Sequence, residues 1–135
     1  MNYNIKIDLF GTKRYYANKV LHRECGPAIE CIDGTKMWYK NGLCHREDGP
    51  AIESDRGKKM WYKNGKLHRE GGPAIDNNNG DKLWLKNGEL HREDGPAIEY
   101  FYGSNEWWLN NKFYGYSNDF TIESWKRFIK TLIFS

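Results

Sequence analysis

The stretch Leu90-His91-Arg92-Glu93-Asp94-Gly95-Pro96-Ala97-Ile98-Glu99 sets the architecture, because close copies of it begin at Leu21, Cys44 and Leu67. Histidine, proline and tryptophan mark the copies and recur together with a period of 23 residues. The marked positions are His22, His45, His68 and His91, the prolines at 27, 50, 73 and 96, and Trp38, Trp61, Trp84 and Trp107. Self-similarity at a fixed period indicates a repeat architecture in which neighbouring units cover one another.

Each unit contains two glycine turns between short runs of β-prone residues. One turn is Asp33-Gly34 or its equivalent, and the other is Asn41-Gly42, Asn64-Gly65 or Asn87-Gly88. These dipeptides favour two-residue hairpin loops, because both central residues of a type I′ turn need a positive φ. The sequence therefore predicts an all-β repeat, an elongated twisted antiparallel sheet of stacked β-hairpins with a C-terminal capping α-helix.

We expect a single domain over residues 1–135 with three parts. Residues 1–20 form a divergent N-terminal cap hairpin, residues 21–113 hold four 23-residue repeats, and residues 119–133 form the cap helix. Thr121 suits the N-cap, and Glu123 suits the first turn. The stripe expected to face the sheet is Ile122, Trp125, Ile129 and Leu132. A helix lying on a membrane surface is the alternative interpretation.

The first glycine turn also predicts which side chains share a face. If Asp33-Gly34 alone forms the loop, Ile29 lies opposite Trp38, and Ala28 lies opposite Tyr39. The Ile–Trp pairs then form the core, each buried side chain contributing roughly 1.5–3 kcal/mol. The other face is the predicted partner-binding surface, unless it is merely solvated. Its residues are Tyr39, Tyr62, Leu85 and Trp108 with Met37, Met60 and Leu83, and a polar rim of Glu30, Glu53 and Glu99.

A 23-residue unit with Asp-Gly, an aromatic strand, Asn-Gly and then a histidine resembles the MORN repeat. The similarity covers most of the chain, from residue 10 or so to residue 115. Arginine follows each histidine where that family usually has glycine, so the chain looks like a variant branch associated with phages and large DNA viruses. The resemblance implies a scaffold. The phospholipid binding proposed for MORN proteins, and the antitoxin label of distant relatives, cannot be assigned to individual residues here.

The His-Arg-Glu-Asp run invites a catalytic or metal-binding interpretation, which the repeat geometry argues against. Equivalent residues of adjacent two-stranded units lie about 9–10 Å apart, whereas zinc donors lie about 2.0–2.3 Å from one ion. No nucleophile is kept, because position 25 and its equivalents read Cys25, Asp48, Gly71 and Asp94. We therefore expect no catalytic residue, no metal and no cofactor, and side chains that brace the loop.

The three cysteines do not suggest a disulfide framework, because their number is odd and Cys25 and Cys31 have no copies in later units. This favours a reducing cytoplasm. Cys44 could be a reactive thiol, but leucine replaces it at Leu67 and Leu90, so a small hydrophobic residue is the preferred interpretation. No apolar stretch reaches the roughly 18 residues that span a bilayer, so no membrane insertion is expected.

These features favour a non-enzymatic protein-interaction module. For a viral or phage protein, the partner would be a host protein in the host cytoplasm, which is inhibited or sequestered as an anti-defence measure. The alternative is a nucleotide or single-stranded nucleic-acid binding protein, which the net charge of +3 supports only weakly. Its ligand would contact the lysine rows and an anionic-ligand ladder of Arg23, Arg46, Arg69 and Arg92.

Overall fold

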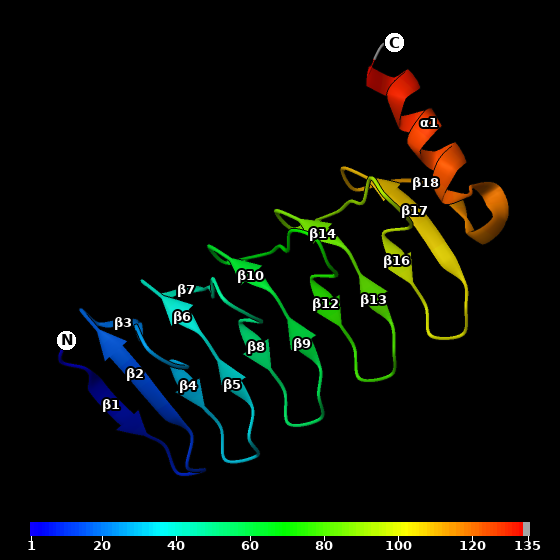
Figure 1. The fold of residues 1–135 in the computed structure, drawn as a ribbon. Helices are drawn as coiled ribbons and strands as arrows, with labels where there is room; N and C mark the ends of the chain where they lie inside the picture. The colour runs from blue at the N-terminus through cyan, green and yellow to red at the C-terminus, as the bar shows by residue number, and fades with distance from the viewer. Residues whose placement is uncertain (134–135) are drawn as a thin grey trace.

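The structure, a computed structural model, describes residues 1–133 and is a long, open antiparallel sheet with one helix at its C-terminal end (Figure 1). The expected fold class is confirmed. The main sheet has 12 strands, ordered along the chain. They are β1 (Asn4–Ile7), β2 (Lys13–Ala17), β4 (Ile29–Glu30), β5 (Lys36–Met37), β8 (Ile52–Glu53), β9 (Lys59–Met60), β12 (Ile75–Asp76), β13 (Lys82–Leu83), β16 (Ile98–Glu99), β17 (Asn105–Leu109) and β18 (Lys112–Tyr116), with β3 (Val20–Leu21) paired to β2.

A second tier of short hairpins extends the main strands, and we call these the outer hairpins (Figure 1). They are β6 (Tyr39–Lys40) with β7 (Leu43–Cys44), β10 (Tyr62–Lys63) with β11 (Lys66–Leu67), and β14 (Leu85–Lys86) with β15 (Glu89–Leu90). Trp38 alone separates β5 from β6. Its N–H donates to the Ala51 carbonyl (2.7 Å), and its carbonyl accepts from the His45 N–H (3.0 Å), so both groups pair with the main chain that follows. The two short strands therefore form one extended run.

The Asn-Gly turns close the outer hairpins as expected. Asn41 and Gly42 have φ values of 52° and 80°, and Tyr39 pairs with Cys44. Two consecutive positive φ angles define the type I′ geometry that matches the twist of the flanking strands.

The main-sheet hairpin has a longer loop than predicted. The Gly34 N–H donates to the Cys31 carbonyl (3.0 Å), the Cys31 N–H donates to the Thr35 carbonyl (2.9 Å), and Gly34 has φ 98°. Residues 32–34 thus form a three-residue loop with glycine in the last position. Ile29 consequently lies opposite Met37, not Trp38, and the predicted Ile–Trp core is wrong. A one-residue change in register moves every side chain of a strand to the other face.

The corrected register creates one face that is apolar across the repeats. Cross-strand partners share a face, and the pairing continues through every unit without a charged residue between Ile29 and Ile98. This row is Ile29, Met37, Ile52, Met60, Ile75, Leu83 and Ile98. We call the side of the sheet that contains it the apolar face.

The opposite side, which we call the tryptophan face, has a row of alternating charges. Opposite charges on neighbouring strands each contribute roughly 0.2–1 kcal/mol. The row is Lys13, Glu30, Lys36, Glu53, Lys59, Asp76, Lys82 and Glu99. Ala28 and Trp38 lie on this face by strand alternation. The predicted placement of Ala28 opposite Tyr39 is therefore wrong, and so is that of Glu30 on the same face as Met37.

The fully buried hydrophobic residues of the repeats are alanines, while Ile29, Leu85 and Ile98 are buried with a little exposed surface. Ala28, Ala51, Ala74 and Ala97 have no exposed surface, whereas Trp38, Trp61 and Trp84 are half-buried. Each alanine is bonded on both sides: the Ala28 N–H donates to the Met37 carbonyl (2.8 Å), and its carbonyl accepts from the Tyr15 N–H (2.8 Å). The alanine column thus holds adjacent units together by main-chain bonds at positions with no exposed surface.

The helix α1 (Ile122–Ile133) follows a short 3₁₀ turn η1 (Ser117–Asp119) and begins three residues later than expected. Thr121 is the N-cap, as expected: its Oγ1 accepts from the Ser124 N–H (3.0 Å). Trp125 is fully buried, but Ile122 is half-exposed and does not belong to the packed stripe, whereas Phe128 does. No helix within residues 1–133 is long and apolar enough to cross a membrane.

The helix covers the last tryptophan of the array. The Trp125 ring lies 5.2 Å from that of Trp107, and its Nε1–H donates to the Arg92 carbonyl (3.0 Å). Trp107 and Leu109 are the other buried members of this cluster. The helix thus caps the end of the sheet at which no further unit follows.

Replacing Trp125 with alanine should lower the free energy of unfolding by about 3–5 kcal/mol, because a fully buried indole leaves a cavity at the end of the array. Denaturant unfolding followed by circular dichroism measures the effect. Lys126→Ala, on the exposed side of the same helix, is the matched control. Equal stability of the two variants would contradict the capping role.

Candidate functional site

An arginine stacked on an aromatic ring recurs in every unit. The Arg69 guanidinium carbon lies 3.8 Å from the Trp61 ring centroid, and Arg92 lies 3.6 Å from that of Trp84. Arg46 on Trp38 (3.8 Å) and Arg23 on Tyr15 (3.9 Å) complete the series. Such cation–π contacts contribute roughly 0.5–2 kcal/mol each, depending on how far the pair is desolvated.

A glycine lies against each of these arginines. A Cβ atom at Gly72 would be 2.6 Å from the Arg69 Cζ, and one at Gly95 would be 2.7 Å from the Arg92 Cζ. Neither glycine has a positive φ, so it is the space beside the guanidinium, not the backbone conformation, that requires a residue without a side chain. The glycine three positions after each arginine is thus part of the stack.

Hydrogen bonds hold the guanidinium in this position. The Arg46 Nη1 donates to the Pro50 carbonyl (3.0 Å) and to Glu53 Oε1 (3.2 Å), while its Nε donates to Asp48 Oδ1 (3.0 Å). The corresponding proline carbonyls, at positions 27, 73 and 96, accept from the other three arginines. The predicted rim residues Glu30, Glu53 and Glu99 lie near these arginines, on the tryptophan face, and do not border the apolar residues.

Each histidine joins the hairpin that ends just before it to the next Asn-Gly turn or its equivalent. The His45 Nδ1 accepts from the Asn64 N–H in the following Asn-Gly turn (2.9 Å), so the ring proton resides on Nε2, which donates to Glu47 (2.7 Å). Both ring nitrogens are occupied, as befits a loop brace. Equivalent bonds run from Asn41 to His22, Asn87 to His68 and Asn110 to His91. Within residues 1–133, no group of three or more His, Cys, Asp or Glu side chains is arranged to hold a metal ion.

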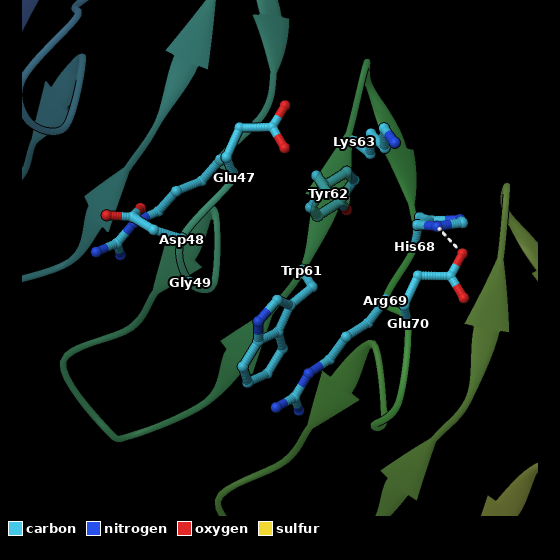
Figure 2. Close-up of a pocket in the computed structure, with 10 residues that line it drawn as sticks. Glu47, Asp48, Gly49, Trp61, Tyr62, Lys63, His68, Arg69 and Glu70 are labelled. Carbon is cyan, nitrogen blue, oxygen red and sulfur yellow. Dashed lines mark hydrogen bonds and ion pairs between the residues drawn. The ribbon is translucent and has the colours of Figure 1, made fainter.

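An open pocket lies between each two successive His-Arg-Glu loops. Figure 2 shows the one of about 560 Å³ that is lined by Trp61, Lys63, His68, Arg69 and Glu70, with Glu47 across from them. Equivalent pockets of about 650 and 310 Å³ contain Trp38 and Trp84. Each has both cationic and anionic side chains in its wall.

The structure divides the predicted contact residues between two tiers. Met37, Met60 and Leu83 lie in the apolar row. Tyr39, Tyr62 and Leu85 lie in the outer hairpins, opposite Cys44, Leu67 and Leu90, and Leu85 is buried. Trp108 lies in β17 of the main sheet, opposite Phe113. Strand alternation through Trp38 places Tyr39 on the same face as Met37. Sequence reasoning placed the isoleucines of the row on the tryptophan side, because the two-residue and three-residue loops have the same Asp-Gly signature.

The outer hairpins have a half-buried cluster around Cys44. Burial raises the pKa of the Cys44 thiol to about 11. Burial, and then the charge of a Cys44 thiolate, also raises the pKa of Tyr39 and of Tyr62. The surroundings of Cys44 therefore suit a small hydrophobic residue and oppose its ionisation.

Gly72→Ala should destabilise the protein by about 1–3 kcal/mol, because its methyl group overlaps the Arg69 guanidinium. In an Arg69→Ala background the same change should be neutral or stabilise by about 0.4–1 kcal/mol, since the clash is gone and alanine restricts the unfolded chain. A double-mutant cycle of urea unfolding measures both effects. The stack is not the reason for the glycine if the two backgrounds respond alike.

At pH 8, iodoacetamide should modify Cys44 more than tenfold more slowly than the exposed Cys25. With a pKa of about 11, roughly one Cys44 thiol in a thousand is a thiolate at that pH. The Cys44 rate should rise about tenfold per pH unit up to pH 10, as long as the fold persists. Peptide mass spectrometry gives both rates, and comparable rates at pH 8 would contradict the buried, protonated state.

Comparison of the chain with family models, with curated proteins and with solved structures gives no match. The two faces must therefore be interpreted from the contacts, burial and charge of their own residues.

Proposed function

We propose that this chain is a non-catalytic interaction module whose apolar face binds a partner protein. Occupation of that partner's surface would inhibit or sequester it, as expected for a viral protein acting on a host protein. The observation behind the proposal is an uninterrupted apolar row on one side of an open sheet, partly exposed from Met37 to Leu83 and buried at its ends, Ile29 and Ile98.

The composition of the apolar face supports this proposal. Methionines at Met37 and Met60 alternate with isoleucines, and both are half-buried within the chain itself. Flexible thioether side chains adapt to the shape of a partner, and tyrosines and methionines are common in interface centres. The helix α1 packs on Trp107, on the other face, and therefore does not cover this row.

The repetition of the polar groups favours a surface over a reaction centre. The histidine, arginine and glutamate of each unit bond to groups of the same or the next unit. An enzyme needs one preorganised site, whereas an extended partner gains from several equivalent contacts in a row. We therefore propose that recognition, not chemistry, is the role of the array.

Affinity purification with the native chain, compared with Met60→Gln and Lys59→Gln, tests the proposal. These neighbours point to opposite faces, so Met60→Gln should lose the partner while Lys59→Gln retains it. Tyr62→Ala should weaken binding in the same direction as Met60→Gln. Thermal unfolding of all three variants confirms that they are folded.

The partner is identified by mass spectrometry, and its affinity is then measured with purified components. Loss of more than tenfold in affinity for Met60→Gln, with less than twofold for Lys59→Gln, is the expected result. A partner retained equally by both variants, or no partner that depends on either, would overturn the assignment of the binding face.

A further inference from the structure

The repeats differ in how they neutralise their arginine. Arg46 has two carboxylate partners, Asp48 and Glu53. Arg92 likewise has Asp94 and Glu99, and Arg23 has Glu30. Arg69 has no carboxylate partner within residues 1–133, and its interactions are the Trp61 ring and the Pro73 carbonyl.

Two differences in the sequence explain this exception. Gly71 stands where the second and fourth units have Asp48 and Asp94, and Asp76 is one methylene shorter than the glutamate at the equivalent position of the other units. Asp76 lies 3.6 Å from Lys82 instead. The third unit therefore leaves hydrogen-bond donors of a positioned, partly desolvated guanidinium without an anion.

The outer hairpin that leads into the third unit has a second electrostatic irregularity. Lys63 lies directly opposite Lys66, and like charges in directly opposed positions destabilise a hairpin. The equivalent pairs are Lys40 with Leu43 and Lys86 with Glu89. Local rules of stability are broken most often at functional sites.

The lysines and Arg69 line two pockets that share part of their walls. A pocket of about 450 Å³ is lined by Lys63, Lys66, Lys86, His68 and Glu70. It shares Lys63, His68 and Glu70 with the pocket of Figure 2, which also includes Arg69. The three lysines form no ion pair within residues 1–133. Glu70, the carboxylate common to both pockets, is bonded to His68 at 3.0 Å.

We propose that the junction of the second and third repeats binds a small ligand with a short chain of phosphates through Lys63, Lys66 and Lys86, with Arg69 in the adjoining pocket. Guanidinium groups and lysines are the usual phosphate ligands of proteins, the former through a fixed fork of donors and the latter as point charges. The volume is that of a small-molecule site. Several charges gathered in one hollow favour a compact polyanion over an extended acidic peptide. The site lies on the tryptophan face and is independent of the partner-binding proposal.

Isothermal titration calorimetry at low salt, with inorganic triphosphate and with adenosine triphosphate, tests the site. Lys66→Leu copies the residue at Leu43 and removes one phosphate contact. Its affinity for triphosphate should fall at least tenfold. Lys40→Leu, the matched control, removes the equivalent of Lys63 from the preceding unit and should change the affinity less than twofold. Affinity of the native chain should also fall steeply as salt is added.

The same variants give a second, ligand-free measurement. Lys66→Leu removes the repulsion from Lys63, so its melting temperature without ligand should be higher than that of the native chain. Triphosphate should raise the melting temperature of the native chain and not that of Lys66→Leu.

Equal affinity for the two ligands supports recognition of the phosphate chain alone, and tighter binding of the nucleotide supports an additional contact to the base or sugar. Absence of binding by both ligands at low salt would overturn the proposal. An equal loss in Lys40→Leu would also overturn it, because the interaction would then reflect diffuse positive charge.

Discussion

The arginine that lies between an indole ring and a glycine backbone holds each unit to its place in the array. It covers the half-buried tryptophan, which an open sheet leaves without a second layer, and it donates to the proline carbonyl at the start of the next hairpin. The stack thus stands in for the opposing sheet of a β-sandwich. This arrangement explains how a chain with few large aliphatic residues maintains an ordered sheet.

The sequence was sufficient for the architecture, because its period and its Asn-Gly turns specify hairpins directly. It was insufficient to predict which side chains lie on which face of the sheet. Asp33-Gly34 fits both a two-residue loop and the end of a three-residue loop, because glycine takes a positive φ in each. Only the hydrogen bonds that the Cys31 N–H donates and its carbonyl accepts distinguish the two loops. The one extra loop residue places Ile29 opposite Met37, where a two-residue loop would have placed Glu30.

In the candidate site too, interactions within a few residues could be predicted from the sequence, and contacts between distant residues could not. Thr121 and the Asn-Gly turns act within a few residues, so their roles could be predicted. The arginine stack joins residues eight positions apart across a change of direction, and Trp125 reaches Trp107 from beyond the repeats. The spacing of glycine three residues after each arginine was visible in the sequence, but its reason appears only when the guanidinium is seen against it.

At the end of the array, the helix takes the place of the stacked arginine. Gly115 occupies the position at which the other units have arginine, and the indole of Trp125 lies on Trp107 where a guanidinium would otherwise stack. Internal junctions, in contrast, are nearly interchangeable, since each presents the same ring, histidine and turn to its neighbour. A gene encoding such a chain can gain or lose a whole 23-residue module in the middle while keeping both of its ends, so that the length of its surface is open to evolutionary adjustment in fixed steps.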